Sequence, residues 1–220
     1  MTTIRLIINS SACAVALLAI GNSTLQAQNL LSDPGFESGT PVPSGVGGWQ
    51  TFNGAVFSTA EAYTGVYSML LSGPGGYTVP GSVEFFASSP GAEYDLTGYG
   101  FLASPISGTG AGFVQISFFS GPNGTGTDLG TVETGSGNAL TSNQLTSSSP
   151  TGTWTLLDTG IAEAPAGTES VAAYTLVLDP STTTTAYFDD LNFVTVPEPS
   201  SCALASMGVG AFFLWRRQRN

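Results

Sequence analysis

The chain has 220 residues, of which 15 are Asp or Glu, four are Lys or Arg and none is His, so its formal net charge at pH 7 is -11. Residues 28–199 hold all 15 acidic residues and no basic one, so this segment carries a charge of about -15. Nucleic-acid binding is excluded, because phosphate binding needs Lys or Arg to release counterions. The segment also has no Cys, His or Lys, which excludes disulfides and nucleophilic triads of the usual kinds.

The first residues are typical of a secretory signal peptide. A single basic residue, Arg5, precedes an apolar stretch at residues 12–20, and the small residue Ala27 stands before Gln28. This order of basic, apolar and small residues is the one that signal peptidases recognise. We therefore predict a signal peptide at residues 1–27 and an exported domain at residues 28–195.

Short apolar runs separated by turn residues predict an all-β fold for the exported domain. Strands at this spacing favour an antiparallel β-sandwich or jelly roll over a parallel α/β sheet, and no amphipathic helix of three turns is evident. Residues 121–150, rich in Gly, Ser and Thr, are expected to form a long surface excursion. The predicted strands are residues 55–59, 67–72, 82–86, 94–103, 113–120, 152–158, 170–178 and 187–194.

Two of these strands are apolar on both faces. In each of these two strands, residues 94–103 and 113–120, one face must contribute to the core. The opposite faces of the two strands together carry five candidate residues. Either the 121–150 excursion covers this second face, or the face binds sugar, because aromatic rings pack on the C–H groups of a pyranose while an amide holds its hydroxyls. The candidate ligand-binding residues are Tyr99, Phe101, Phe113, Gln115 and Phe119.

The last predicted strand contains a carboxylate that should be buried. Asp189 has the same parity as Tyr187, Leu191 and Phe193, so alternation predicts that it points into the core while Asp190 points outward. A buried carboxylate must be paired, and no basic side chain is available in residues 28–199. Backbone N–H groups, protonation or a metal ion could stabilise it, and Ca²⁺ takes carboxylate and carbonyl oxygens. Glu37 is a second candidate carboxylate for such a site.

The C-terminus has three parts in a fixed order. Pro197, Glu198 and Pro199 precede an apolar run at residues 202–215, and Arg216, Arg217 and Arg219 follow it. Arginines directly after an apolar segment resist translocation. A helix from residue 200 to 215 would be about 24 Å long, against about 30 Å for a hydrocarbon core, so it would be a marginal membrane anchor.

These three parts, at residues 196–220, resemble the PEP-CTERM sorting signal that exosortases process in Gram-negative bacteria. The resemblance implies export across the inner membrane, transient anchoring there by a transmembrane helix, removal of the tail near the Pro-Glu-Pro motif and release to the cell surface or the medium. The alternative is an ordinary single-span anchor that stays attached.

The exported domain resembles a second family, the galactose-binding-like β-sandwiches that include xylan- and glucan-binding carbohydrate-binding modules. The matching landmarks are residues 29–37 with Trp49, residues 62–68, residues 152–154 and residues 187–191. The resemblance implies a structural Ca²⁺ near the first and last strands, with Glu37 and Asp189 as side-chain ligands and Gly35 and residues 63–66 as backbone ligands. It also implies that Trp49 and Trp154 pack structurally.

Two classes of function remain for this chain. The first is an exported, non-catalytic matrix protein of the cell envelope, associated with exopolysaccharide or biofilm, and the sequence favours it. The second is a carbohydrate-binding module that holds a polysaccharide through an aromatic face. Glycoside hydrolysis needs only two carboxylates, but Asp189 and the adjacent Asp190 face opposite sides of a strand, so we predict no enzyme activity.

Overall fold

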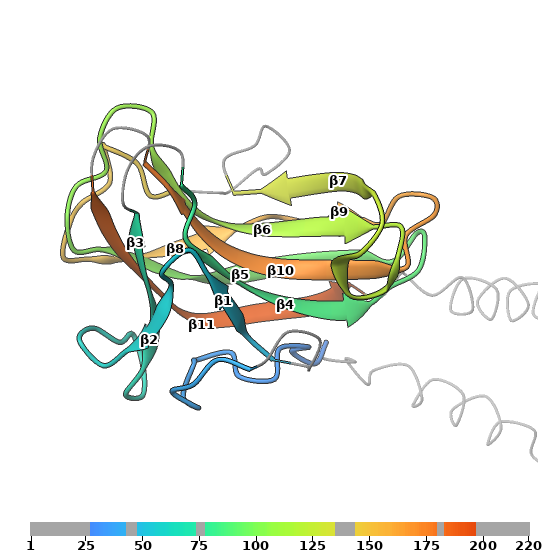
Figure 1. The fold of residues 1–220 in the computed structure, drawn as a ribbon, viewed down its shortest axis with the longest axis horizontal. Helices are drawn as coiled ribbons and strands as arrows, with labels where there is room; N and C mark the ends of the chain where they lie inside the picture. Colours follow the sequence, from blue (N-terminus) through green and yellow to red (C-terminus); the bar gives the residue numbers. More distant parts are fainter. Residues whose placement is uncertain (1–26, 43–47, 74–77, 135–143, 180–182, 197–220) are drawn as a thin grey trace, which may run out of the picture.

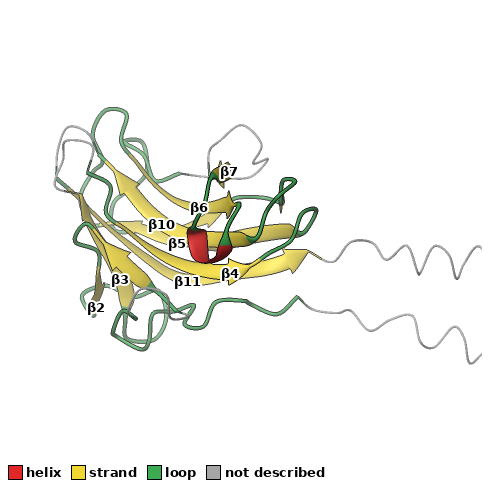
Figure 2. Cartoon of the chain, turned by 45° about the vertical axis from the view of Figure 1, so that its right-hand side comes forward, coloured by secondary structure: helices red, strands yellow, loops and turns green. Residues whose placement is uncertain are grey.

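The computed structural model describes residues 27–42, 48–73, 78–134, 144–179 and 183–196. The predicted signal peptide, apart from Ala27, and the C-terminal sorting signal after Val196 lie outside these residues. Within the described part, two antiparallel sheets pack face to face as a β-sandwich (Figure 1, Figure 2). The predicted all-β fold is therefore confirmed, and the helical content of the described residues is one 3-10 turn, η1 (Pro122–Gly124).

The first sheet has the strand order β1-β4-β10-β6-β7. The second has the order β2-β3-β11-β5-β8, and β9 pairs with one end of β5. The strands of the first sheet are β1 (Gln50–Phe52), β4 (Gly81–Ala87), β10 (Ser170–Leu178), β6 (Ala111–Phe119) and β7 (Asp128–Glu133). Those of the second are β2 (Val56–Ser58), β3 (Ser68–Gly73), β11 (Thr184–Val196), β5 (Glu93–Leu102), β8 (Trp154–Asp158) and β9 (Ala162–Glu163).

All eight predicted strands are present, and three short ones, β1, β7 and β9, were not predicted. The expectation of a loop over residues 121–150 is wrong at two places. β7 extends the first sheet at its edge, and Leu145 pairs with Gly112 and is fully buried. Gly130 interrupts the alternation of β7, which explains why the sequence pattern gives no strand signal there.

The core lies between the two sheets. Alternate residues of each strand point into it, because side chains alternate across a pleated strand. Gly98 and Gly100 of β5 leave room for the side chains of Leu191, Leu145 and Leu157, which would contact a side chain at either glycine. The largest fully buried side chains include Phe36, Phe118, Phe188 and Phe193.

The two ends of the described chain lie at the same end of the sandwich (Figure 1). The N–H of Leu30 donates to the carbonyl of Phe193, 2.7 Å away, so the first described residues run beside the last strand. β11 continues to Val196, which pairs with Glu93. The last strand therefore ends at Val196, immediately before Pro197.

Candidate functional site

The outer face of the first sheet carries a row of residues that crosses all five strands. In the antiparallel register Gln50 is opposite Val83, Val83 opposite Tyr174, Tyr174 opposite Gln115 and Gln115 opposite Glu133. Directly opposed residues project to the same side of a sheet, so these five side chains form one line. We call this surface the amide face. Its central row offers two amides, a hydroxyl and a carboxylate.

Aromatic rings flank the central row of the amide face. The ring of Phe85 meets those of Tyr174 and Phe119 edge-on, with centroids 6.4 and 6.3 Å apart. Phe113 lies on the other side of Gln115, opposite Leu176. The predicted candidates Phe113, Gln115 and Phe119 are thus brought together on one face.

Tyr174 lies in the centre of this face, and alternation did not single it out. Its side chain is half-buried, and burial, followed by the negative charge of Asp128, raises the pKa of Tyr174 to about 12. The hydroxyl is therefore protonated at neutral pH and can donate a hydrogen bond. Its position directly opposite Gln115 could be found only from the strand pairing.

The η1 turn closes one end of the amide face. The N–H of Gly124 donates to Ser170 Oγ at 3.0 Å, and this hydroxyl donates to the carbonyl of Gly121 at 2.6 Å. Gly124 has a φ of 74°, and a Cβ there would lie 2.2 Å from the ring of Phe85. A glycine is required at this position by both the left-handed backbone and the close approach to the ring.

The other two candidates, Tyr99 and Phe101, lie on the opposite side of the molecule. They belong to β5 in the second sheet, whereas Phe113, Gln115 and Phe119 belong to β6 in the first. The prediction that all five form one surface is therefore wrong, because the chain crosses between the sheets after β5. Alternation assigns a residue to a face of its strand and carries no information on which sheet the strand joins.

The outer face of the second sheet also has a row across five strands, here called the ring face. In register order it is Val56, Leu70, Tyr187, Phe101 and Trp154. Trp154 therefore points away from the core. The other landmark tryptophan, Trp49, is buried against Phe36, with centroids 4.9 Å apart, as the second resemblance implies.

Asp189 is fully buried, but it does not point into the core. It lies opposite Tyr99 on the outer side of the second sheet. Asp190 has a φ of 46°, and the register shifts between Asp189 and Asn192, so a β-bulge reverses the parity of the strand at this point. Leu191 and Phe193 are in the core as predicted, whereas the parity argument for Asp189 is wrong.

Backbone N–H groups hold the carboxylate of Asp189. Oδ2 accepts hydrogen bonds from the N–H of Tyr63 at 2.7 Å and of Thr64 at 3.2 Å, and Oδ1 accepts one from the N–H of Asp190 at 2.7 Å. Burial raises the pKa of Asp189 to about 6, although these N–H donors act in the opposite direction. The segment 62–67 therefore covers Asp189 and is fixed by it.

Glu37 holds the same segment two residues further on. Its Oε1 accepts from the N–H groups of Val66 and Tyr67 at 2.9 and 3.0 Å. A Cβ on Gly65, whose φ is 63°, would lie 2.2 Å from this oxygen. Glu37 and Asp189 are thus brought to one segment, which we call the carboxylate-held segment (residues 62–67).

The surroundings of Gly35 suit a hard cation in part. A Cβ there would lie 3.3 Å from Asp190 Oδ1 and 3.7 Å from Asp189 Oδ1, so two carboxylate oxygens lie next to Gly35. Ca²⁺ prefers such donors. Among the described residues, however, no three acidic side chains converge as a metal-binding group. The carboxylates beside Gly35 are therefore those of Asp189 and Asp190, and Glu37 holds the neighbouring segment.

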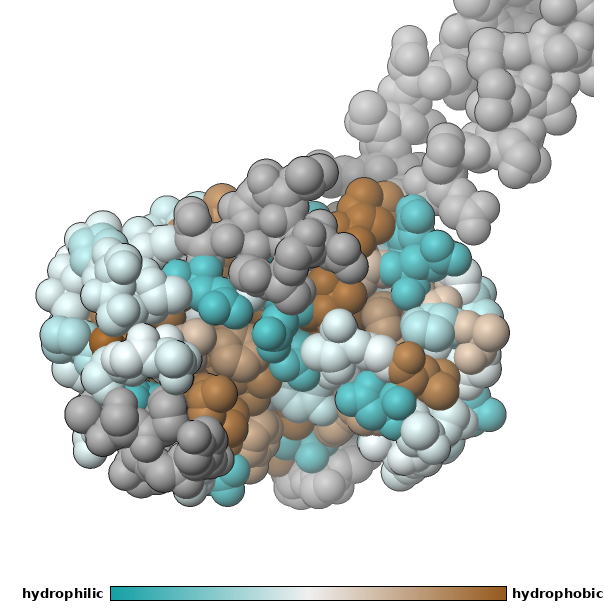
Figure 3. Space-filling model, turned by 90° about the horizontal axis from the view of Figure 1, so that it is seen from above, coloured by the Kyte–Doolittle hydropathy of each residue, from teal (hydrophilic) through white to brown (hydrophobic). Residues whose placement is uncertain are grey.

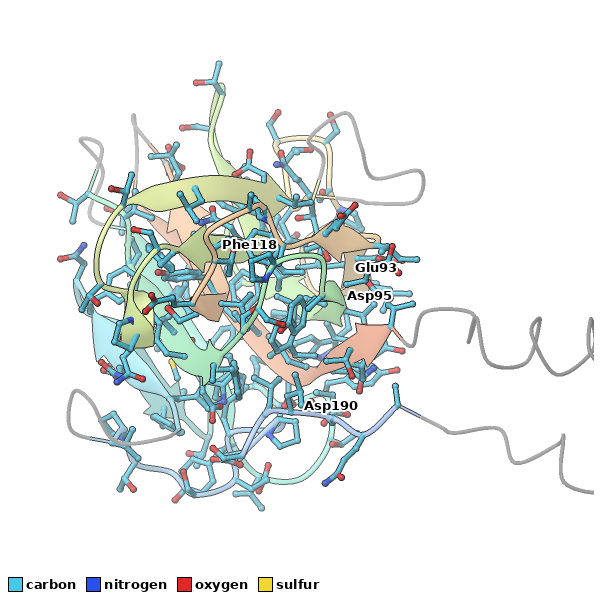
Figure 4. The ribbon with its side chains drawn as sticks, turned by 90° about the vertical axis from the view of Figure 1, so that its right-hand side faces the viewer. Glu93, Asp95, Phe118 and Asp190 are labelled. Atoms are coloured by element: carbon cyan, nitrogen blue, oxygen red, sulfur yellow. The ribbon has the colours of Figure 1, made fainter. Side chains whose placement is uncertain are left out.

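A second acidic group lies on the outer side of β5. Glu93 and Asp95 project from the same side of this strand, while Phe118 lies between the sheets and Asp190 is some distance away (Figure 4). Burial, then the charge and the hydrogen bond of Asp158, raise the pKa of Asp95. Within the described part of the chain, Asp95 Oδ1 is buried without a hydrogen-bond partner.

Replacing Asp95 with asparagine should stabilise the protein at neutral pH. The amide removes a like-charge contact and can donate to Asp158, and such cross-strand effects amount to about 0.2–1 kcal/mol. A raised carboxyl pKa means that the wild type loses stability as the pH rises above the ordinary range of Asp. The gain, about 0.5–4 °C in melting temperature, should therefore be full at pH 7.5 and vanish near pH 3.5. Thermal unfolding at both pH values measures it, and an equal gain at both would contradict this explanation.

Comparison with solved structures defines the class of this fold. The module TmCBM61 in complex with β-1,4-galactotriose matches at a TM-score of 0.51 with 15% identity, covering 77% of this chain and all of that one. The CBM22-1 xylan-binding domain of Paenibacillus barcinonensis Xyn10C matches at 0.52 with 18% identity, covering 78% and 97%. The arabinose-bound α-L-arabinofuranosidase MgGH51 matches at 0.52 with 16% identity, covering 80% of this chain and 27% of that one. The fold is a β-sandwich like that of the two modules, TmCBM61 and CBM22-1.

The C-terminal residues match a known sorting motif. Residues 195–219 match the model of the PEP-CTERM protein-sorting motif, so this β-sandwich protein ends in a PEP-CTERM motif, as predicted. A sequence search of curated proteins gives no match. Among the residues that the structure describes, no helix has the length and apolar character needed to span a membrane.

Proposed function

We propose that this protein is an exported, non-catalytic carbohydrate-binding protein that holds a neutral polysaccharide on the amide face. The observation that carries the proposal is the row of Gln50, Tyr174, Gln115 and Glu133 between aromatic rings. Amides, a hydroxyl and a carboxylate match the donors and acceptors of sugar hydroxyls, and the half-buried rings of Phe85 and Phe119 match the apolar C–H surface of a pyranose, whereas Phe113 is buried. The charge of about -15 on residues 28–199 disfavours acidic glycans.

The fold supports this choice over a purely structural matrix role. Sandwiches of the same architecture include the galactotriose-bound and xylan-binding modules described above. Xylan and β-1,4-galactan are therefore the first polysaccharides to test.

The sorting motif supports export and processing. Its Pro197, Glu198, Pro199 and following arginines would be read by an exosortase-type enzyme at the inner membrane of a Gram-negative bacterium. Removal of the tail would release the sandwich to the cell surface or into exopolysaccharide and biofilm. The C-terminal helix would anchor the chain in the inner membrane until then.

The acidic side chains support a non-catalytic role. Asp95 and Asp158 share a hydrogen bond, so their carboxyl groups are closer than the about 5 Å that separates a retaining glycosidase pair. Asp189 is covered by the carboxylate-held segment and accepts three backbone N–H bonds. Neither arrangement leaves a pair of carboxyl groups on opposite sides of a space for a glycosidic bond.

We also propose that a structural Ca²⁺ binds beside Gly35, with Asp189 and Asp190 as carboxylate ligands. It would neutralise two adjacent carboxylates that have no basic side chain in residues 28–199 to pair with. It would join the N-terminal turn to the last strand.

Binding at the amide face is testable with xylohexaose and β-1,4-galactotriose. Titration of the ¹⁵N-labelled full chain in detergent should shift the side-chain amide resonance of Gln115. Gln115→Ala should weaken binding at this face about tenfold, which corresponds to one hydrogen-bonding group of about 1.4 kcal/mol. Tyr174→Phe should have a similar effect.

The matched control is Asn192→Ala, which removes an exposed amide from the opposite sheet and should leave this affinity unchanged. Binding of either sugar without a shift of the Gln115 amide, or with wild-type affinity in both variants, would place the ligand elsewhere. No binding of xylan or galactan at all would contradict the proposed function.

A further inference from the structure

The ring face has a composition unlike that of an ordinary solvated sheet. Its row from Val56 to Trp154 contains no charged residue, and about 19 Å separates its ends, since neighbouring strands lie about 4.8 Å apart. Val56 at one end is 49% exposed, and Leu156, in the next row, is also 49% exposed. Tyr187 and Phe101 in the middle of the row are buried, so the accessible apolar surface lies toward its ends, around Val56 and around Leu156. Exposed apolar patches on a monomer mark interaction surfaces.

A ring from the carboxylate-held segment adds a flat surface to this face. Tyr63 stacks on Tyr99 with centroids 3.8 Å apart and planes at 17°, and it meets Trp154 edge-on at 5.7 Å. Tyr63 is 41% exposed, so one side of its ring packs on Tyr99 while area remains for a ligand. Phe101 packs between Trp154 and Tyr187, with centroids 5.2 and 6.0 Å away, and supports the layer from below.

Tyr63 is held in place before any ligand arrives. Its N–H is bonded to Asp189, the hydroxyl of Thr64 donates to Asp190 Oδ1 at 2.8 Å, and Glu37 holds Val66. A pre-ordered aromatic side chain loses little conformational entropy on binding. The carboxylate-held segment thus presents a fixed ring to the solvent.

The charges around the ring face select the kind of partner. Asp190, Glu61 and Glu37 lie in or beside the segment that carries Tyr63, and the whole exported domain is strongly negative. A second copy of the chain or an acidic polymer would bring like charges together. A neutral sugar polymer has no such cost, and its C–H groups match exposed rings while its hydroxyls reach Tyr63, Trp154 and the polar rim.

The two faces point in opposite directions, because each is the outer side of one sheet of the sandwich. Because they point apart, each face can bind a glycan chain without the other. Figure 3 shows that the described surface seen from above mixes apolar and hydrophilic residues.

We propose that the ring face, built on Tyr63, Tyr99 and Trp154, is a second binding surface for neutral polysaccharide, and that one molecule bridges two glycan chains. This inference rests on the proposed function of the amide face. It gives the protein a cross-linking activity that a single site cannot provide, since two linked sites raise the effective local concentration of the second chain.

The indole N–H resonances of the full chain report on the ring face directly. Titration with xylohexaose or β-1,4-galactotriose should shift the signal of Trp154. The signal of Trp49 is an internal control, because its Nε1 donates to the carbonyl of Asp33 at 2.7 Å in the interior and should not move. A shift at Gln115 without one at Trp154 would overturn the inference and leave the proposed function intact. Shifts at neither residue would overturn both.

Bridging is measured by the light scattering of soluble xylan mixed with the protein. The wild-type protein should raise the scattering severalfold when the number of protein molecules is close to the number of protein-binding segments on the xylan chains. Gln115→Ala and Trp154→Ala should each reduce this increase to near that of xylan alone, while each variant still binds xylohexaose at its other face. Tyr63→Ala, which changes an exposed side chain, should act like Trp154→Ala and guards against misfolding of the latter.

Two results would overturn the bridging proposal. One is undiminished scattering with both Trp154→Ala and Tyr63→Ala. The other is a shift of the Trp154 signal on raising the protein concentration without sugar, which would assign the ring face to a second copy of the chain.

Discussion

Replacing Asp189 with alanine should lower the melting temperature by about 3–10 °C. The substitution leaves the N–H groups of Tyr63 and Thr64 without their acceptor, at a cost of about 1–3 kcal/mol, and 1 kcal/mol corresponds to about 2–4 °C for a domain of this size. Loss of the desolvated carboxylate offsets part of the cost, because burial raises the pKa of Asp189.

Hydrogen exchange identifies the cause of this destabilisation. In Asp189→Ala the amides of Tyr63 and Thr64 should exchange at least tenfold faster, while those of Val66 and Tyr67, which Glu37 holds, should change less. Glu169→Ala, a change at an exposed carboxylate, is the control and should alter neither quantity. Unchanged exchange at residues 63 and 64 would show that Asp189 does not fix the segment.

Adding Ca²⁺ to metal-free protein should raise its melting temperature by about 5–10 °C. A ligand that binds only the folded state stabilises by about 2.7 kcal/mol at 100 times its dissociation constant. The effect should be lost in Asp190→Asn as well as in Asp189→Ala, since both carboxylates border the space beside Gly35.

Mg²⁺ at the same concentration is the control, because it demands stricter geometry and retains its waters. An equal rise with both ions, or an undiminished rise in the variants, would indicate binding to the acidic surface in general. No rise with Ca²⁺ would contradict the proposed metal site, and the backbone N–H groups would then be the groups that stabilise Asp189.

Sequence periodicity predicted the architecture well because the strands alternate strongly. In β6, Val114, Ile116 and Phe118 are all buried in the core, as their common parity predicts. The short strands β1 and β9 have three and two residues, too few for alternation to stand out. β7 was missed because it is an edge strand with a glycine and half-exposed side chains.

The candidate site was predicted only in part, for two physical reasons. Strand pairing depends on long-range contacts, so the sequence could not separate Tyr99 and Phe101 from Phe113, Gln115 and Phe119. A bulge costs one residue of register, and the left-handed Asp190 that forms it reverses every later side chain. The burial of Asp189 was predicted correctly, whereas its direction depended on that single residue.

The common exit of both chain ends determines how the sandwich would stand when its tail is still inserted. β11 pairs with β5 as far as Val196, whose partner is Glu93, so the folded body continues up to the residue before Pro197. If the tail anchors the chain in the membrane, a body held at that end would stand with its strands along the membrane normal and both sheet faces turned sideways, perpendicular to the membrane plane. Neighbouring molecules in a crowded layer would then screen each other's sides, and release of the tail would be the step that frees them to engage long polymers.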